Sequence, residues 1–203
     1  LNVRITFKLA RRYVDQQKYP LAARDIMLVE EFVDGPPVTV EGWVYQHEPH
    51  IWAITDTNTY AGSRVIDNFS LPSQHSAHIQ QLLAERAKAA IHSVGIDNGF
   101  FNIEFWCHED SVTLTEINGR AATCFYNLYR HCLNACIYEA GLQLACGRSP
   151  IVKLGAAKQV GGQFNFITFA NDRADRLLDF EQARAIPGLT LYFSENDQIT
   201  QMS

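Results

Sequence analysis

Three side chains with complementary chemistry lie two residues apart in the segment LTEINGR: Glu116, Asn118 and Arg120. In an extended strand, residues at this spacing share one face, so the segment presents an anion, an amide and a cation on the same side. Carboxylate and amide oxygens are ligands for a hard divalent cation, and a guanidinium pairs with phosphate oxygens. The segment therefore predicts a face that binds a ligand.

The sequence FFNIEFWCHEDSVTLTEIN predicts a β-hairpin whose turn lies in residues 108–111. If Cys107 pairs with Thr113, Glu104 lies directly opposite Glu116, whereas a one-residue slip sends the two carboxylates to opposite faces. The first strand of this hairpin places three residues on one face: Asn102, Glu104 and Trp106. The hairpin thus predicts a pair of facing carboxylates.

Opposed like charges destabilise a sheet unless something neutralises them. Mg²⁺ or Mn²⁺ would do so, with Glu104, Glu116 and Asn118 as its ligands, while Arg120 pairs with phosphate oxygens or stabilises the charge that builds up in transfer. The alternative interpretation is that both glutamates lie on a solvated hairpin face. The combination of two carboxylates, an amide and an arginine favours the cation.

Elements before and after the hairpin must position it. An apolar strand leads into Glu30, a turn follows at residues 34–37, and alternation predicts strands at 38–44 and 50–60, followed by a polar loop at 62–73. Ser73 and Ser76 are candidate N-caps for a helix over 77–94 that Gly95 ends. Its apolar stripe comprises Ile79, Leu82, Leu83, Ala87, Ala90, Ile91 and Val94.

Further elements are predicted at both ends of the chain. A strand opens the sequence, and a short basic helix follows it as far as Pro20. A second long helix is predicted over 124–145, with Phe125, Leu128, Cys132, Cys136 and Leu142 as its buried positions. After Pro150, strands at 160–170 and 189–194 flank a helical segment at 173–183.

Composition limits the classes of protein. The 203 residues carry a formal net charge of -5, with 47% apolar and 19% charged residues, which is typical of a globular domain and argues against nucleic acid as a partner. No apolar run is long enough to span a bilayer and no signal stretch opens the chain, so we expect a cytoplasmic protein without a membrane partner. Because the chain begins at Leu1 within a predicted strand, we expect it to be a piece of a longer protein.

The five cysteines are odd in number, which fits reduced thiols better than a disulfide framework. Cys132 and Cys136 share a helical face and are either part of a metal site or small apolar side chains. No second pair at zinc spacing accompanies them, so the packing interpretation is favoured.

Three segments together, LVEEFVDGP, FNIEFW and LTEINGR, resemble the C-terminal half of ATP-grasp ligases, most closely the branch that joins a carboxylate to an amine, including amino-acid ligases. The resemblance covers residues 1–147. It implies an α+β fold with an ATP-grasp-like antiparallel sheet and flanking helices, and residues 148–203 would form a small β-rich C-terminal lobe. It also implies that Glu104, Glu116 and Asn118 hold magnesium on ATP, and that Arg120 contacts the transferring phosphate or acyl phosphate.

The same resemblance assigns Glu30, Glu31, Phe32 and Val33 to a hinge that holds adenine; the alternative is a buried strand ending in solvated glutamates. Many relatives carry a glutamate for the ribose hydroxyls where this chain has Pro37, so Asp34 or Glu41 would have to substitute. The family's glycine-rich loop and two lysines would lie before Leu1. We therefore expect these 203 residues alone to be inactive.

The implied reaction forms an amide or peptide bond from small-molecule carboxylate and amine substrates, with amino acids as candidates, through an acyl phosphate. Arg64, in the loop after Thr55, is either a clamp for a substrate carboxylate or a solvated side chain. Three alternatives remain open: a carboxylase that uses bicarbonate, a nucleotide-binding module without catalysis, and a structural domain. The sequence is compatible with a homodimer but does not fix the oligomeric state.

Overall fold

The computed structural model describes residues 30–152, 160–165, 167 and 171–199. The chain divides into two units, 1–33 and 34–203, and only residues 30–33 of the first unit are described. The expected opening strand, the basic helix and most of the strand that leads into Glu30 therefore lie outside the described residues.

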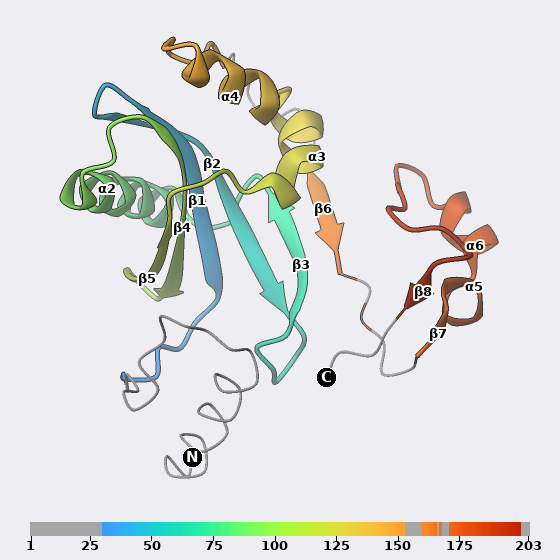
Figure 1. The fold of residues 1–203 in the computed structure, drawn as a ribbon. Coiled ribbons are helices and arrows are strands. Elements are labelled where there is room, and N and C mark those ends of the chain that lie inside the picture. Colours follow the sequence, from blue (N-terminus) through green and yellow to red (C-terminus); the bar gives the residue numbers. More distant parts are fainter. Residues whose placement is uncertain (1–29, 153–159, 166, 168–170, 200–203) are drawn as a thin grey trace, which may run out of the picture. The chain divides into compact units, whose positions relative to one another are not determined.

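Within the described residues, six strands form one antiparallel sheet in the order β5-β4-β1-β2-β3-β6 (Figure 1). Their bounds are Pro37–Tyr45 (β1), Glu48–Thr59 (β2), Ile66–Leu71 (β3), Gly99–His108 (β4), Ser111–Asn118 (β5) and Gly161–Phe164 (β6). The predicted strands at 38–44 and 50–60 are confirmed. The predicted loop at 62–73 is wrong in part, because β3 lies within it and pairs with both β2 and β6.

Tight two-residue turns connect β1 to β2 and β4 to β5. Gln46 and His47 link β1 to β2 with φ angles of 51° and 66°, and Glu109 in the β4–β5 turn has a φ of 48°. Left-handed residues in a two-residue connection match the right-handed twist of the strands that they join. The β4–β5 turn lies where the sequence predicts it, between His108 and Ser111.

Helix α2, Ala77–Val94, covers one face of the sheet, and its predicted bounds are confirmed. The Ser76 hydroxyl accepts a hydrogen bond from the Ile79 amide, and Gly95 ends the helix at a φ of 72°. The buried residues of the stripe are Ile79, Leu83, Ala87 and Ile91. They pack against β1 and β4 side chains such as Val40 and Ile103, so this face has its own apolar core. Val94, expected in the stripe, is 52% exposed.

The opposite face is covered by a broken helical segment: η1 (Thr123–Phe125), α3 (Tyr126–Leu128), η2 (Tyr129–Leu133) and α4 (Ile137–Ala145). The predicted continuous helix at 124–145 is therefore wrong. Asn134 adopts a left-handed φ of 52° and Cys136 is extended, which interrupts the helical hydrogen-bond ladder. The buried positions Phe125, Leu128 and Cys132 are confirmed, Cys136 is half-buried, and Leu142 is 68% exposed, because α4 starts on a new axis after the break.

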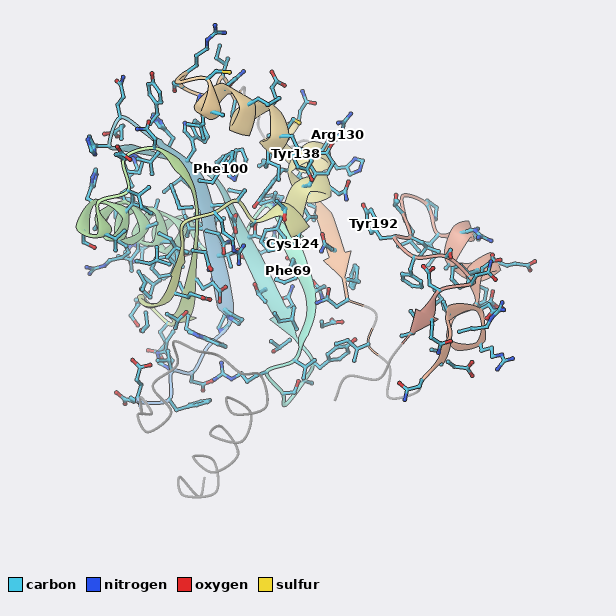
Figure 2. All side chains as sticks on the ribbon, in the orientation of Figure 1. Phe69, Phe100, Cys124, Arg130, Tyr138 and Tyr192 are labelled. Carbon is cyan, nitrogen blue, oxygen red and sulfur yellow. The ribbon has the colours of Figure 1, made fainter. Side chains whose placement is uncertain are left out.

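Aromatic side chains fill the space between this segment and the sheet. Phe100 of β4 lies 5.7 Å from Trp52 between ring centroids, and Phe69 of β3 lies 4.7 Å from Phe125 (Figure 2). Tyr129 is fully buried against Trp52. Two exposed side chains of the segment contact Tyr126: the Tyr138 ring packs against its ring, and Arg130 donates a hydrogen bond to its hydroxyl (Figure 2).

The described residues after 170 form a two-stranded pairing of β7 (Asp172–Arg173) with β8 (Gln198–Ile199), together with α5 (Ala174–Leu177) and α6 (Phe180–Ala185). The predicted helical segment at 173–183 is split in two at Leu178, whose backbone is extended. The predicted strand at 189–194 is wrong, because these residues form turns and irregular backbone. Since β6 pairs with β3, part of the chain after residue 147 belongs to the large sheet; the domain boundary at 147 stays a prediction.

Candidate functional site

Glu104 and Glu116 lie opposite each other in the β4–β5 hairpin, as the sequence predicts. The register that produces this pairing differs from the predicted one, because Cys107 pairs with Val112 rather than with Thr113. A β-bulge between Glu104 and Phe105 makes up the difference of one residue. Thr115 is the extra residue on β5, and its hydroxyl donates to the Glu104 carbonyl at 3.1 Å. Without the bulge, Glu116 would lie on the other face of the sheet.

We name Thr39, Glu104 and Glu116 the carboxylate row, because the three residues pair across β1, β4 and β5. Glu104 is half-buried and Glu116 is exposed. Burial raises the pKa of Glu104, the neighbouring Glu116 carboxyl raises it further, and the Arg120 guanidinium lowers it. The repulsion between the two carboxylates is thus only partly relieved by the chain's own cation.

A second row crosses the same three strands two residues further along β1. We name Glu41, Asn102 and Asn118 the amide row; the pairings are Glu41 with Asn102 and Asn102 with Asn118. The Asn102 amide donates to Glu41 Oε1 at 3.3 Å, and the Asn118 amide donates to Asn102 Oδ1 at 3.5 Å. Arg120 Nη2 donates to Asn118 Oδ1 at 3.4 Å. The two rows are adjacent, so Asn118 and Arg120 lie beside the carboxylate pair.

Glu41 is the most enclosed carboxyl group of this face, at 1% exposed. It accepts hydrogen bonds from the hydroxyls of Thr39 and Thr55, the latter at 2.9 Å, in addition to the amide of Asn102. Burial raises the pKa of Glu41 to about 8, and the three donors act in the opposite direction. Its carboxyl therefore faces into the row rather than outwards.

The remaining predicted site residues lie at the start of the described chain. Glu30, Glu31 and Phe32 are exposed, Val33 is half-buried, and all four belong to the first unit. Their role in holding adenine stays a prediction. Pro37 opens β1 opposite Trp106. Arg64 stacks over the Trp106 ring, 4.0 Å from its centroid, and its guanidinium lies 3.8 Å from the Asp34 carboxylate.

Residues Asn102, Thr39 and Thr55 belong to this site, although sequence reasoning gave them no role. Asn102 shares a face with Glu104 by its spacing of two, and Thr39 stands in the same relation to Glu41. These spacings were the available signal. What they could not provide is the pairing of β1 with β4, which joins residues about 60 positions apart.

The donor set fits a hard divalent cation. In the described parts of the chain, no three His, Cys, Asp or Glu side chains cluster at a distance that would hold a metal on their own. Mg²⁺ commonly takes one or two protein carboxylates and completes its octahedron with water and substrate phosphates. Glu104, Glu116 and the Asn118 amide oxygen, with Arg120 beside them, match that pattern.

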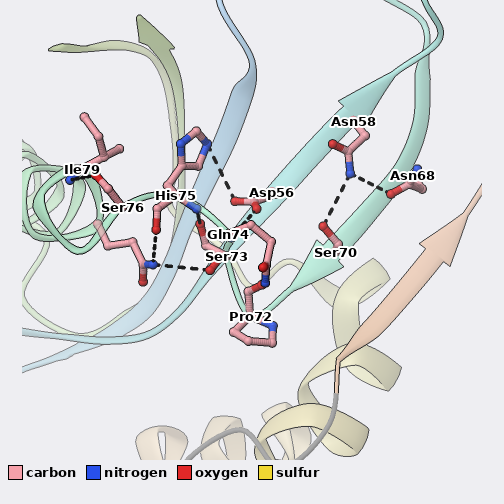
Figure 3. Close-up of polar contacts among 11 residues, drawn as sticks. Asp56, Asn58, Asn68, Ser70, Pro72, Ser73, Gln74, His75, Ser76 and Ile79 are labelled. Carbon is pink, nitrogen blue, oxygen red and sulfur yellow. Dashed lines mark hydrogen bonds and ion pairs between the residues drawn. The ribbon is translucent and has the colours of Figure 1, made fainter. Parts of the chain in front are cut away.

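A polar cluster on the α2 face has a structural role. Asp56 of β2 accepts from the Gln74 amide at 2.7 Å, and His75 Nε2 lies 3.9 Å from its other oxygen (Figure 3). The Ser73 hydroxyl accepts from the His75 amide at 3.3 Å. These contacts hold the residues that precede α2 against the sheet, so they fix the helix that supports the hairpin from behind.

Comparison with known proteins identifies the family. The family model described as the ATP-grasp domain matches residues 6–127, more than half of the chain. The chain belongs to the ATP-grasp family. The predicted family and the predicted α+β antiparallel sheet with flanking helices are therefore confirmed.

Solved structures share the fold at low sequence identity. Phosphoribosylglycinamide synthetase from Anaerococcus prevotii has a TM-score of 0.66 at 21% identity, with 93% of this chain and 50% of that chain covered. L-amino acid ligase from Bacillus licheniformis has a TM-score of 0.68 at 14% identity, covering 84% and 44%. N5-carboxyaminoimidazole synthase from Aspergillus clavatus, in complex with ADP and 5-aminoimidazole ribonucleotide, has a TM-score of 0.62 at 20% identity, covering 82% and 44%.

The chain spans half or less of the length of these three structural neighbours. No curated protein sequence matches it. None of the helices in the described residues has the length and apolarity that a membrane span requires.

Proposed function

We propose that the protein is an ATP-dependent carboxylate-amine ligase that forms an amide or peptide bond through an acyl phosphate. The observation that carries the proposal is the facing pair Glu104 and Glu116, with Asn118 and Arg120 on the same side. Membership of the ATP-grasp family supports it, and ligases stand among the structural neighbours. The activity is proposed for the full-length protein, because this chain covers half or less of those neighbours.

In this proposal the carboxylates of Glu104 and Glu116 and the oxygen of Asn118 would hold Mg²⁺ or Mn²⁺ with ATP. Such a cation would neutralise polyphosphate charge and help to orient the γ-phosphate. Glu30, Glu31, Phe32 and Val33 hold adenine. Glu41 belongs to the same nucleotide site, but its buried carboxyl supports the site from within the sheet.

The reaction then has two steps. A substrate carboxylate attacks the γ-phosphate, releasing ADP and forming an acyl phosphate, and an amine displaces phosphate to leave an amide. Arg120 lies where its guanidinium can stabilise charge on the transferring phosphoryl group. Because a carboxylate is a weak nucleophile, positioning of both substrates carries much of the rate. Exclusion of water protects the acyl phosphate from hydrolysis.

A carboxylase that uses bicarbonate is the second candidate. N5-carboxyaminoimidazole synthases share the fold, and their likeness to this chain is similar in degree to that of the L-amino acid ligase. Both reactions would use the same nucleotide site. The acceptor that drives ATP turnover separates them.

The test is phosphate release by the full-length protein with Mg²⁺, ATP and pairs of amino acids. Release with particular pairs, lost in Glu116→Gln and kept in Glu109→Gln, supports the ligase. Glu109 is a matched control, because it is an exposed glutamate in the turn of the same hairpin. Release driven only by bicarbonate would move the assignment to a carboxylase. Nucleotide binding without turnover for any acceptor would contradict catalysis.

Three further expectations depend on the same proposal. Amino acids are the first substrates to test, because an L-amino acid ligase shares the fold. We place the protein in the cytoplasm and expect neither nucleic acid nor membrane as a partner. A homodimer is tested by light scattering of the full-length protein, where a monomer mass would exclude it.

A further inference from the structure

The hydrogen bonds of the amide row all run in one direction. Arg120 donates to the Asn118 oxygen, the Asn118 amide nitrogen donates to the Asn102 oxygen, and the Asn102 nitrogen donates to Glu41. The distances of 3.4, 3.5 and 3.3 Å are at the long end of the hydrogen-bond range. Each bond is therefore weak alone, and the orientation of the amides depends on the whole row.

Glu41, the last acceptor of the row, sets this direction. A side-chain amide has one oxygen that accepts and one nitrogen that donates, so fixing one end fixes the other. Glu41 presents an acceptor oxygen to Asn102 whether it is ionised or protonated, since a protonated carboxyl keeps one carbonyl oxygen. Asn102 must then turn its nitrogen to Glu41 and its oxygen to Asn118. The Asn118 nitrogen consequently faces inwards, and its oxygen faces Arg120.

The Asn118 oxygen is the atom that a cation would need. With the amide turned the other way, its nitrogen would take the place of this oxygen beside Arg120, and an amide nitrogen does not ligate Mg²⁺. Glu41 can hold the row because its own position is fixed: the hydroxyls of Thr39 and Thr55 both donate to it, and its side chain is 1% exposed.

We propose that Glu41 is a positioning residue for the nucleotide-bound cation, acting through Asn102 to keep the Asn118 oxygen turned towards the ligand. This inference rests on the proposed function, since it assumes that Asn118 ligates the cation. Glu41 does not touch the ligand itself. Groups behind metal ligands act in this way when they fix which atom of a ligand faces the metal.

A purely structural role for Glu41 would have a different signature. A buried carboxyl with three donors also stabilises the pairing of β1 with its neighbours, so any substitution lowers stability. That effect is independent of Asn118. The positioning role predicts that Glu41 matters for cation affinity only while Asn118 is present, and that any acceptor of similar shape suffices.

The experiment measures Mn²⁺ affinity in the presence of ADP, by electron paramagnetic resonance of free Mn²⁺, on the full-length protein. Glu41→Met removes the acceptor and should weaken Mn²⁺ binding about tenfold, in the range seen when a group behind a metal ligand is removed. Glu41→Gln keeps an oxygen for Asn102 and should bind Mn²⁺ like the wild type. In an Asn118→Ala background, Glu41→Met should cause no further loss.

Several outcomes would overturn the inference: wild-type affinity in Glu41→Met, an equal loss in Glu41→Gln, or the same fold-loss with and without Asn118. Should Glu41→Met fail to fold, Asn102→Ala interrupts the row at its middle and carries the same expectation. The proposed function fails separately, if Glu116→Gln binds Mn²⁺ and ADP as tightly as the wild type. Thermal melting of each variant shows whether affinity and stability change together.

Discussion

The carboxylate row and the amide row cross the same strands on the same face, yet they differ in how their charges are satisfied. In the amide row, Glu41 is buried and has three donors from the chain. In the carboxylate row, Glu104 faces another carboxylate, and the nearby cation Arg120 only partly offsets the rise in its pKa. A carboxyl satisfied by internal donors supports the structure, whereas one left in repulsion at the surface is suited to a ligand that carries positive charge.

The largest expected effect concerns the stability contributed by the amide row. Glu41→Met leaves the hydroxyls of Thr39 and Thr55 and the amide of Asn102 without their acceptor. We expect the free energy of unfolding to fall by about 3 kcal/mol, because buried donors without partners are costly. Urea denaturation measures it. A loss below about 1 kcal/mol would show that the row contributes little to the fold.

The second prediction concerns pH. The folded pKa of Glu41, raised to about 8 from an ordinary value of 4.5, means that the folded state holds this proton more tightly than the unfolded state. The contribution of Glu41 to stability is therefore fully present below the unfolded pKa and is lost as pH rises towards the folded pKa, at most by about 1.4 kcal/mol per pH unit. We expect a loss of about 2 kcal/mol between about pH 5.5 and pH 7.

Glu41→Gln provides the matched comparison for that pH dependence, since it keeps the shape of the side chain but cannot ionise. Glu104 also has a raised pKa and contributes in the same direction in both proteins. Urea denaturation at several pH values should give a flatter profile for the variant. Identical profiles would contradict the assignment of a buried, titrating carboxyl to the amide row.

The smallest expected effect concerns the carboxylate row. Glu116→Gln removes the repulsion with Glu104, so without divalent cations it should raise the free energy of unfolding by about 0.5 kcal/mol. Glu109→Gln, in the turn of the same hairpin, should leave it unchanged. A clear loss of stability in Glu116→Gln would mean that the pair is already satisfied within the protein.

Local signals in the sequence predicted the parts of the fold that depend on neighbouring residues. The caps Ser76 and Gly95 and the apolar stripe between them predicted α2 with its observed bounds. The polar strand β3 was missed, because its residues suggest a loop and only pairing with β2 and β6 makes it a strand. The break near Asn134 was missed because the apolar pattern continues through it.

In the candidate site too, local signals predicted only the features that depend on neighbouring residues. Spacing along one hairpin predicted the facing of Glu104 and Glu116 but not the bulge at Thr115 that produces it. The amide row needs β1 beside β4, a pairing that no local pattern encodes. Sequence could therefore name the carboxylates and the amide on the hairpin, but it gave no role to Asn102, Thr39 or Thr55 and considered Glu41 only for the ribose hydroxyls.

The central claim is that Glu104 and Glu116 face each other in order to hold a divalent cation on a nucleotide. Calorimetric titration of ADP into the full-length protein, with and without Mg²⁺, tests it most directly. We predict that Mg²⁺ tightens ADP binding about tenfold or more, equivalent to about 1.4 kcal/mol, in the wild type and in Glu109→Gln, but not in Glu116→Gln. An equal effect of Mg²⁺ on all three proteins would contradict the claim.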